Sequence, residues 1–268
     1  MNMPGAVRVS VVGDFNGWDG RVNPMRRIDY TDIFELFIPG DLANTRYKFE
    51  ALYRDGNVDI FADPYAVAYE VAPGNASILT ELEYRWNDSA YMKNRNKAAG
   101  VNIYEVHMPT WGNVPDDGKL TYAEFGREIA TYVKNMGYNY IQFMPLMEYG
   151  DDSGWGYDTV GMFAPTSRYG TPVDFMAMVD HLHSKGIGVI MDMVTVKDID
   201  CLSYWIDTYH LDGIRIEDEE LVREFRNITG DRYADVLVGL GWNNEAVTRV
   251  TDYMMIPPAA RGSFSDYT

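Results

Sequence analysis

Three charged side chains that could take part in acid–base chemistry fall on two predicted strands. Asp192 lies in the apolar strand expected over 188–194, and Arg215 and Glu217 lie in the one expected over 213–217. Carboxylates can act as nucleophiles or as general acids and bases, and an arginine can hold a carboxylate in place. The same residue types also form structural ion-pair networks at the rim of a sheet, so both interpretations stay open.

The positions of the histidines indicate structural roles. His181 and His183 lie two positions apart on a predicted helix, so they cannot share a helical face and are not expected to bind a metal together. We expect His107 to be structural and His210 to lie at the surface. No metal and no cofactor is expected.

Charge and composition narrow the class of partner. The 268 residues include 23 basic and 40 acidic side chains, giving a net charge of −17. Such a surface repels phosphate backbones and anionic lipid, so no nucleic-acid or membrane partner is expected. Sugars are neutral, and 20 Tyr with 6 Trp suit stacking on sugar rings, although most of these aromatics are expected in the core.

The location expected for the chain is cytoplasmic. No apolar run approaches the roughly 20 residues that cross a bilayer, and no secretory signal is present. Cys201, the one cysteine, cannot form an internal disulfide and is expected to be a buried thiol in a reducing compartment.

The two halves of the chain have different patterns. Short alternating apolar runs separated by turns predict an antiparallel β-sandwich in the first domain, residues 1–95, with a hairpin turn at Asp55-Gly56. The runs cover residues 7–12, 33–38, 47–53 and 76–82.

Strands and helices alternate in the second domain, residues 101–268. This pattern predicts a parallel sheet or barrel with five or six strands. The strands are expected over 101–108, 140–146, 188–194, 213–217, 236–240 and 251–256, and the helices over 122–135, 172–185, 199–209 and 219–228.

Several motifs resemble known families. The segment Gly13-Asp14-Phe15-Asn16-Gly17-Trp18 resembles a family 48 carbohydrate-binding module. The second half is similar to the catalytic barrel of glycoside hydrolase family 13, and its motifs together resemble those of 1,4-α-glucan branching enzymes. These motifs are Ile103–His107, Met144–Glu148, Trp155–Tyr157 and Phe163–Pro172.

The resemblance implies an immunoglobulin-like β-sandwich followed by an incomplete α/β barrel of the (β/α)8 type. It also implies retaining transglycosylation of α-glucan (glycogen or amylose), with a nucleophile and an acid/base about 5–5.5 Å apart. Glu217 stands at the nucleophile position, Arg215 at the position that orients it, and Asp192 at a family aspartate. The substrate-binding positions match Tyr157, which would stack under the sugar, and Trp18, Lys48 and Asn75 of the module.

The chain departs from the family at its catalytic positions. Position 217 is Glu where the family has Asp, and no histidine follows Asp192. The strand expected to carry the acid/base glutamate ends with Gly239 and Gly241, and the family's later His-Asp pair would lie beyond Thr268. We therefore expect a chain that is catalytically impaired and at most binds α-glucan.

Two alternatives stay open. One is an active branching enzyme whose acid/base has moved to Glu219 or Glu245, and the other is a structural or regulatory partner that binds no sugar. The incomplete barrel is expected to be covered by a homodimer, by pairing with another chain or by rearrangement of the C-terminal segment. If the family architecture is kept, Asp192, Arg215 and Glu217 are expected to meet at one end of the strands, near Tyr157.

Overall fold

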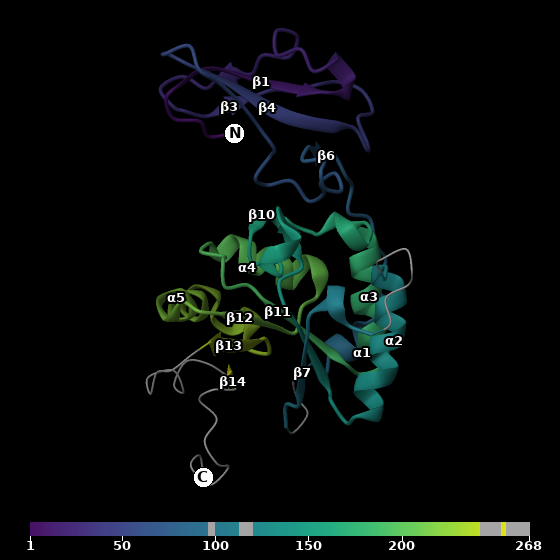
Figure 1. Ribbon diagram of the computed structural model, residues 1–268. Coiled ribbons are helices and arrows are strands. Elements are labelled where there is room, and N and C mark those ends of the chain that lie inside the picture. Colours follow the sequence, from purple (N-terminus) through teal and green to yellow (C-terminus); the bar gives the residue numbers. More distant parts are fainter. Residues whose placement is uncertain (96–99, 113–119, 242–252, 256–268) are drawn as a thin grey trace.

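A computed structural model describes residues 1–95, 100–112, 120–241 and 253–255. The chain forms an antiparallel β unit, which contains the N-terminus, and a larger unit built on a parallel sheet with helices (Figure 1). This is the predicted fold class.

The first unit is organised around the long strand β4 (Arg46–Tyr53). This strand pairs antiparallel with β1 (Ala6–Gly13), β5 (Val58–Phe61) and β6 (Ser77–Ile78), and β2 (Arg26–Arg27) pairs with β3 (Phe34–Glu35). The predicted hairpin is confirmed, because β4 and β5 are joined through Asp55-Gly56, where Gly56 has a φ of 87°. A small core holds the unit together: Ala6, Val9, Phe34, Phe49 and Ala51.

Two of the predicted strands are much shorter than expected. The run 33–38 keeps only β3, because Phe34 is buried whereas Phe37 is 86% exposed. The run 76–82 keeps only β6, after which Leu79 bonds to the backbone of Asn44 and Thr45.

The second unit contains a six-stranded parallel sheet in the order β14-β13-β12-β11-β8-β7. Consecutive strands in this order follow one another in the chain once the hairpin β9–β10 is set aside, as expected for part of a βα barrel. The strand bounds are β7 Ile103–Val106, β8 Tyr140–Phe143, β11 Gly188–Asp192, β12 Gly213–Ile216, β13 Leu237–Gly241 and β14 Tyr253–Met255.

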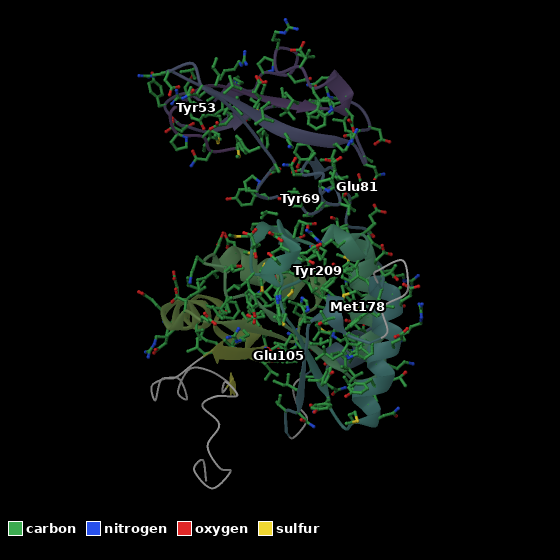
Figure 2. The ribbon with its side chains drawn as sticks, viewed as in Figure 1. Tyr53, Tyr69, Glu81, Glu105, Met178 and Tyr209 are labelled. Atoms are coloured by element: carbon green, nitrogen blue, oxygen red, sulfur yellow. The ribbon has the colours of Figure 1, made fainter. Side chains whose placement is uncertain are left out.

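Four helices pack on one face of this sheet (Figure 1). They are α2 (Tyr122–Asn135), α3 (Pro172–Ser184), α4 (Ile199–Tyr209) and α5 (Glu219–Thr229). Thr121 and Thr171 begin α2 and α3 with reciprocal capping bonds, which satisfy N–H groups that the helix leaves unpaired. Helices α2 and α3 approach closely at Gly126, where an added Cβ would lie 2.9 Å from Met178 (Figure 2 labels Met178).

A hairpin of the second unit, which the sequence did not predict, contacts the first unit. Strands β9 (Met147–Tyr149) and β10 (Thr159–Pro165) pair antiparallel beside the sheet. Tyr69 of the first unit lies against this hairpin, so close to Gly161 that an added Cβ there would lie 2.4 Å from its ring (Figure 2). Tyr65 also packs on Phe163, with ring centroids 5.3 Å apart.

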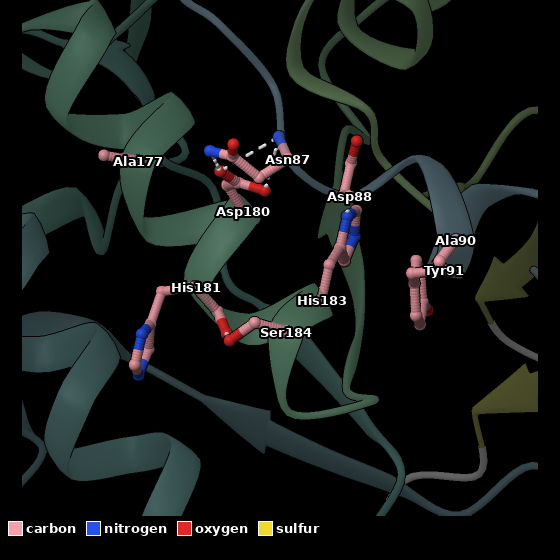
Figure 3. A pocket seen from close by; sticks show the side chains of 9 residues that line it. All are labelled: Asn87, Asp88, Ala90, Tyr91, Ala177, Asp180, His181, His183 and Ser184. Atoms are coloured by element: carbon pink, nitrogen blue, oxygen red, sulfur yellow. Dashed lines mark hydrogen bonds and ion pairs between the residues drawn. The ribbon is translucent and has the colours of Figure 1, made fainter.

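The segment leading to the parallel sheet is held by a buried network. The short helix α1 (Ser89–Met92) follows Asp88, whose carboxylate is 2.8 Å from Nδ1 of both His183 and His210. The other His183 nitrogen, Nε2, lies 2.9 Å from Asp212. Tyr91 stacks on the His183 ring at 4.1 Å beside a cavity of about 470 Å3 (Figure 3).

This network corrects one prediction. His210 was expected at the surface, but its ring stacks on Trp86 at 3.8 Å and its side chain is only 23% exposed. Residues 84–95 therefore contact the parallel-sheet unit, and Arg95 also pairs with Asp235 at 2.8 Å. The domain limits at residues 95 and 101 stay a prediction.

Three further observations concern the described residues only. No helix among them is long and apolar enough to span a bilayer, and no cluster of metal-binding side chains is found among them. Cys201 is buried, as predicted, and burial raises the pKa of its thiol to about 12.

Candidate active site at the carboxyl edge of the sheet

The register of the sheet brings the predicted catalytic residues to one edge. Asp192 ends β11 and lies opposite Arg215 of β12, which in turn lies opposite Gly239 of β13. Glu217 follows β12 directly. Because alternate residues of a strand share a face, Arg215 and Glu217 project to the same side as Asp192.

Hydrogen bonds join these side chains into one cluster. Arg215 donates from Nη1 to Asp192 Oδ2 at 2.5 Å and from Nη2 to Glu217 Oε1 at 2.9 Å. The Tyr157 hydroxyl, from the β9–β10 connection, donates to the same Asp192 oxygen at 2.8 Å. The predicted meeting of Asp192, Arg215 and Glu217 near Tyr157 is confirmed. Their chemical roles stay proposals.

The carboxylates of Asp192 and Glu217 differ in their exposure to solvent. Asp192 is fully buried, whereas the Glu217 side chain is 49% exposed. Burial raises the pKa of Asp192, and the Arg215 charge and the Tyr157 hydroxyl only partly oppose this effect. Burial disfavours the charge of Arg215, but Asp192 and Glu217 outweigh that effect and raise its pKa. Burial also raises the pKa of Tyr157, and Asp192 adds to the shift, so the phenol stays a proton donor to Asp192.

Two polar atoms of the cluster are buried without a hydrogen-bond partner among the described residues. They are Oδ1 of Asp192 and Nε of Arg215. Buried polar atoms are nearly always paired, and an exception calls for an explanation such as a ligand or a water.

The two carboxylates that follow Glu217 along the chain are bonded within α5, away from the cluster. Glu219 lies in the first turn of α5 and pairs with Arg223. Asp218 caps α5 by accepting from the Leu221 N–H at 3.1 Å. Glu245, the other candidate, lies outside the described residues.

Two residues near the cluster were missed by the sequence reasoning. Glu105 of β7 is exposed on the face of the sheet that carries Asp192, as the register Glu105–Gln142–Ile190 indicates, and its charge contributes to raising the pKa of Tyr157. Trp155 stacks on His107, with ring centroids 5.2 Å apart. Glu105 and His107 both belong to the motif Ile103–His107, and strand alternation could have identified Glu105.

The sugar-binding positions predicted in the first unit are only partly brought together. Lys48 donates to Asn75 Oδ1 at 2.5 Å, and both line a cavity of about 600 Å3. The opposite wall of that cavity comes from the hairpin of the second unit and includes Gly150 and Val160. Trp18, 39% exposed, donates instead to Asp14 at 3.2 Å and does not line the cavity.

Two family descriptions match separate parts of the chain. Residues 3–66 match Carbohydrate-binding module 48 (Isoamylase N-terminal domain), and residues 128–197 match Alpha amylase, catalytic domain. These segments contain the β4–β5 hairpin and the strands β8 and β11, respectively.

Curated relatives similar to the chain include 1,4-α-glucan branching enzymes. The one from Aquifex aeolicus is 46% identical over 199 residues, which cover 71% of this chain and 31% of that enzyme. The one from Rhodospirillum rubrum is 43% identical over 217 residues, which cover 78% of this chain and 29% of that enzyme. The chain therefore spans about a third of the length of these relatives.

A solved structure supports the fold. The pullulanase from Paenibacillus barengoltzii, crystallised with maltohexaose and α-cyclodextrin, superposes with a TM-score of 0.74 at 18% identity. The match covers 91% of this chain and 51% of the pullulanase. At this identity the likeness concerns the fold alone.

Proposed function

We infer that this chain, which belongs by sequence to the branching-enzyme family of α-glucan metabolism, binds α-glucan but is impaired in branching it. The proposal concerns the chain of 268 residues itself, because its relatives are about three times longer.

One observation carries the proposal. Both carboxylates of the cluster are bonded to the same guanidinium, Asp192 at 2.5 Å and Glu217 at 2.9 Å, while the neighbouring strand offers Gly239 opposite Arg215. Retaining transfer needs a nucleophile on one side of the sugar and a proton donor on the other. Here the strand expected to supply the donor carries glycine, so protonation of the leaving oxygen lacks a general acid.

The residue at position 217 adds a second obstacle. Glutamate carries the carboxylate one methylene farther from the backbone than aspartate, which displaces the oxygens by roughly 1.5 Å, and misplacement by about 1 Å can cost about 100-fold in rate. We expect Glu217→Asp alone to restore no branching, because the general acid and the histidine after Asp192 remain absent.

Glucan binding is supported by side chains of both units. The ring of Tyr157 is half-buried at the edge of the cluster, so part of it is open to a sugar. In the first unit, Lys48 and Asn75 line the cavity of about 600 Å3. A neutral glucan is not repelled by the net charge of −17.

Native affinity electrophoresis tests this binding. The chain is run through gels with and without glycogen, beside a reference protein that does not bind glucan. We expect retardation in the glycogen gel, weaker for Lys48→Ala than for Lys185→Ala, which makes the same charge change at the end of α3. Unchanged mobility of the wild type would instead favour a structural or regulatory partner that binds no sugar.

We also propose that pairing of chains covers the outer strands of the sheet. Among the described residues, β7 and β14 each pair with a neighbour on one side only. Exposed strand edges favour association. Sedimentation velocity is expected to show a dimer, and a monomer at micromolar concentration would contradict the pairing.

A further inference from the structure

Trp155 occupies a backbone conformation that bulky residues rarely adopt. Its φ and ψ are 58° and 25°, in the left-handed region, and Gly156 follows with a φ of 88°. A Cβ on Gly156 would lie 2.3 Å from the Pro145 carbonyl oxygen, so the turn is packed tightly against the chain between β8 and β9. A glycine at position 155 would adopt this conformation without strain.

Packing in the core does not account for a tryptophan at position 155. Its side chain is 58% exposed and lies outside the core of the parallel-sheet unit. Its one described ring contact is His107, with centroids 5.2 Å apart and planes 22° apart. Nδ1 of His107 lies 3.0 Å from Thr110 Oγ1, which fixes the imidazole that supports the indole. One face of a positioned indole is therefore left toward solvent.

The indole lies close to the proposed active site in the fold. Trp155 precedes by two residues Tyr157, which is bonded to Asp192 at 2.8 Å. Its support, His107, directly follows β7, so it lies at the same carboxyl edge of the sheet as Asp192 and Glu217. The turn thus carries two aromatic side chains at this edge, one bonded to the cluster and one exposed.

We propose that the exposed face of Trp155 is a stacking platform for a glucose unit next to the one held at Tyr157. The proposal rests on the proposed function and adds a second sugar position to it. The C–H face of a pyranose is apolar and neutral, and it gains by covering an aromatic ring that water otherwise wets. A rigid platform binds with little loss of conformational freedom, which fits an indole supported from below.

Maltohexaose binding measured by titration calorimetry tests the platform. Lys48 and Asn75 are first replaced by alanine, so that the first unit contributes little. In this background we compare Trp155→Gly, Trp155→Phe and Tyr30→Gly. Tyr30 is the matched control, because it is also an exposed aromatic with a φ near 62° but lies in the first unit.

We expect the dissociation constant to rise at least tenfold in Trp155→Gly, and to stay within about threefold of the parent in Trp155→Phe and Tyr30→Gly. The urea midpoint of Trp155→Gly should not fall, because glycine relieves the strained backbone. Equal affinities of Trp155→Gly and its parent would overturn the platform alone. Binding by the wild-type chain but not by the parent would also overturn the platform, and would leave glucan binding to the first unit. No binding by the wild-type chain would overturn the proposed function together with the platform.

Discussion

His183 makes the stability of the parallel-sheet unit depend on pH. Its side chain is fully buried between Asp88 and Asp212, under the ring of Tyr91, and His210 shares the Asp88 carboxylate. Burial lowers the pKa of the imidazole, but the hydrogen bonds and charges of the two aspartates outweigh it and raise the pKa from 6.5 to about 9. The folded state therefore favours the protonated ring.

The size of the effect follows from this shift. One pKa unit corresponds to about 1.4 kcal/mol, so the shift stabilises the fold by about 3 kcal/mol where His183 is protonated in both states. Because the folded pKa is the higher one, this contribution is complete below pH 6.5 and is lost as the pH rises to 9. The free energy of unfolding should fall by about 3 kcal/mol across that window.

Urea unfolding of the wild type between pH 6 and pH 9.5 measures this change. His181→Gln is the matched control, since His181 lies on the same helix. Burial lowers the pKa of His181, so its titration changes the free energy of unfolding only at pH values below 6.5. We expect this control to keep the decline above pH 6.5, whereas His183→Gln should lose the decline, because it removes the titrating imidazole between Asp88 and Asp212.

A second measurement uses the wild-type chain and does not depend on the folding of His183→Gln. An NMR titration of the wild-type imidazole should give a midpoint well above 6.5 for His183. A midpoint at or below 6.5, or a free energy of unfolding that is flat from pH 6.5 to 9, would refute the assigned network.

Other variants test the cluster and its surroundings. Arg215→Met leaves Asp192 buried without its cation and should lower the free energy of unfolding, measured by urea titration, by about 3–5 kcal/mol. Glu217→Gln changes a half-exposed ion pair and should change the same free energy by less than about 1 kcal/mol. Equal effects would contradict the assigned burial. Asp218→Ala removes the cap of α5 and should cost about 1 kcal/mol, and an unchanged urea midpoint would show that the cap contributes nothing.

Much of the architecture could be predicted because local patterns agree with the final packing. The helices α2 and α4 span the predicted residues, since apolar spacing and the capping residues Thr121 and Asp198 fix their limits. The alternation of strands and helices predicted a parallel sheet, which the structure confirms. The hairpin β9–β10 was not predicted, because its register shifts twice and its pattern includes glycines.

The candidate site was predicted in position but not in detail. Strand alternation and the family motifs brought Asp192, Arg215 and Glu217 to one edge, yet the sharing of one guanidinium by both carboxylates depends on distances that sequence does not give. His210 was misplaced for the same reason, because its partner Asp88 lies 122 residues away in the chain.

The central claim is that the cluster lacks the proton donor needed to transfer a glucan chain. Purified chain incubated with amylose, followed by iodine staining over time, tests it most directly, with a full-length branching enzyme as the positive control. We predict that the blue colour persists at protein concentrations for which retardation by glucan is observed. Loss of the blue colour with the wild-type chain, abolished in Glu217→Gln, would contradict the claim and assign the acid/base role to another residue such as Glu219 or Glu245.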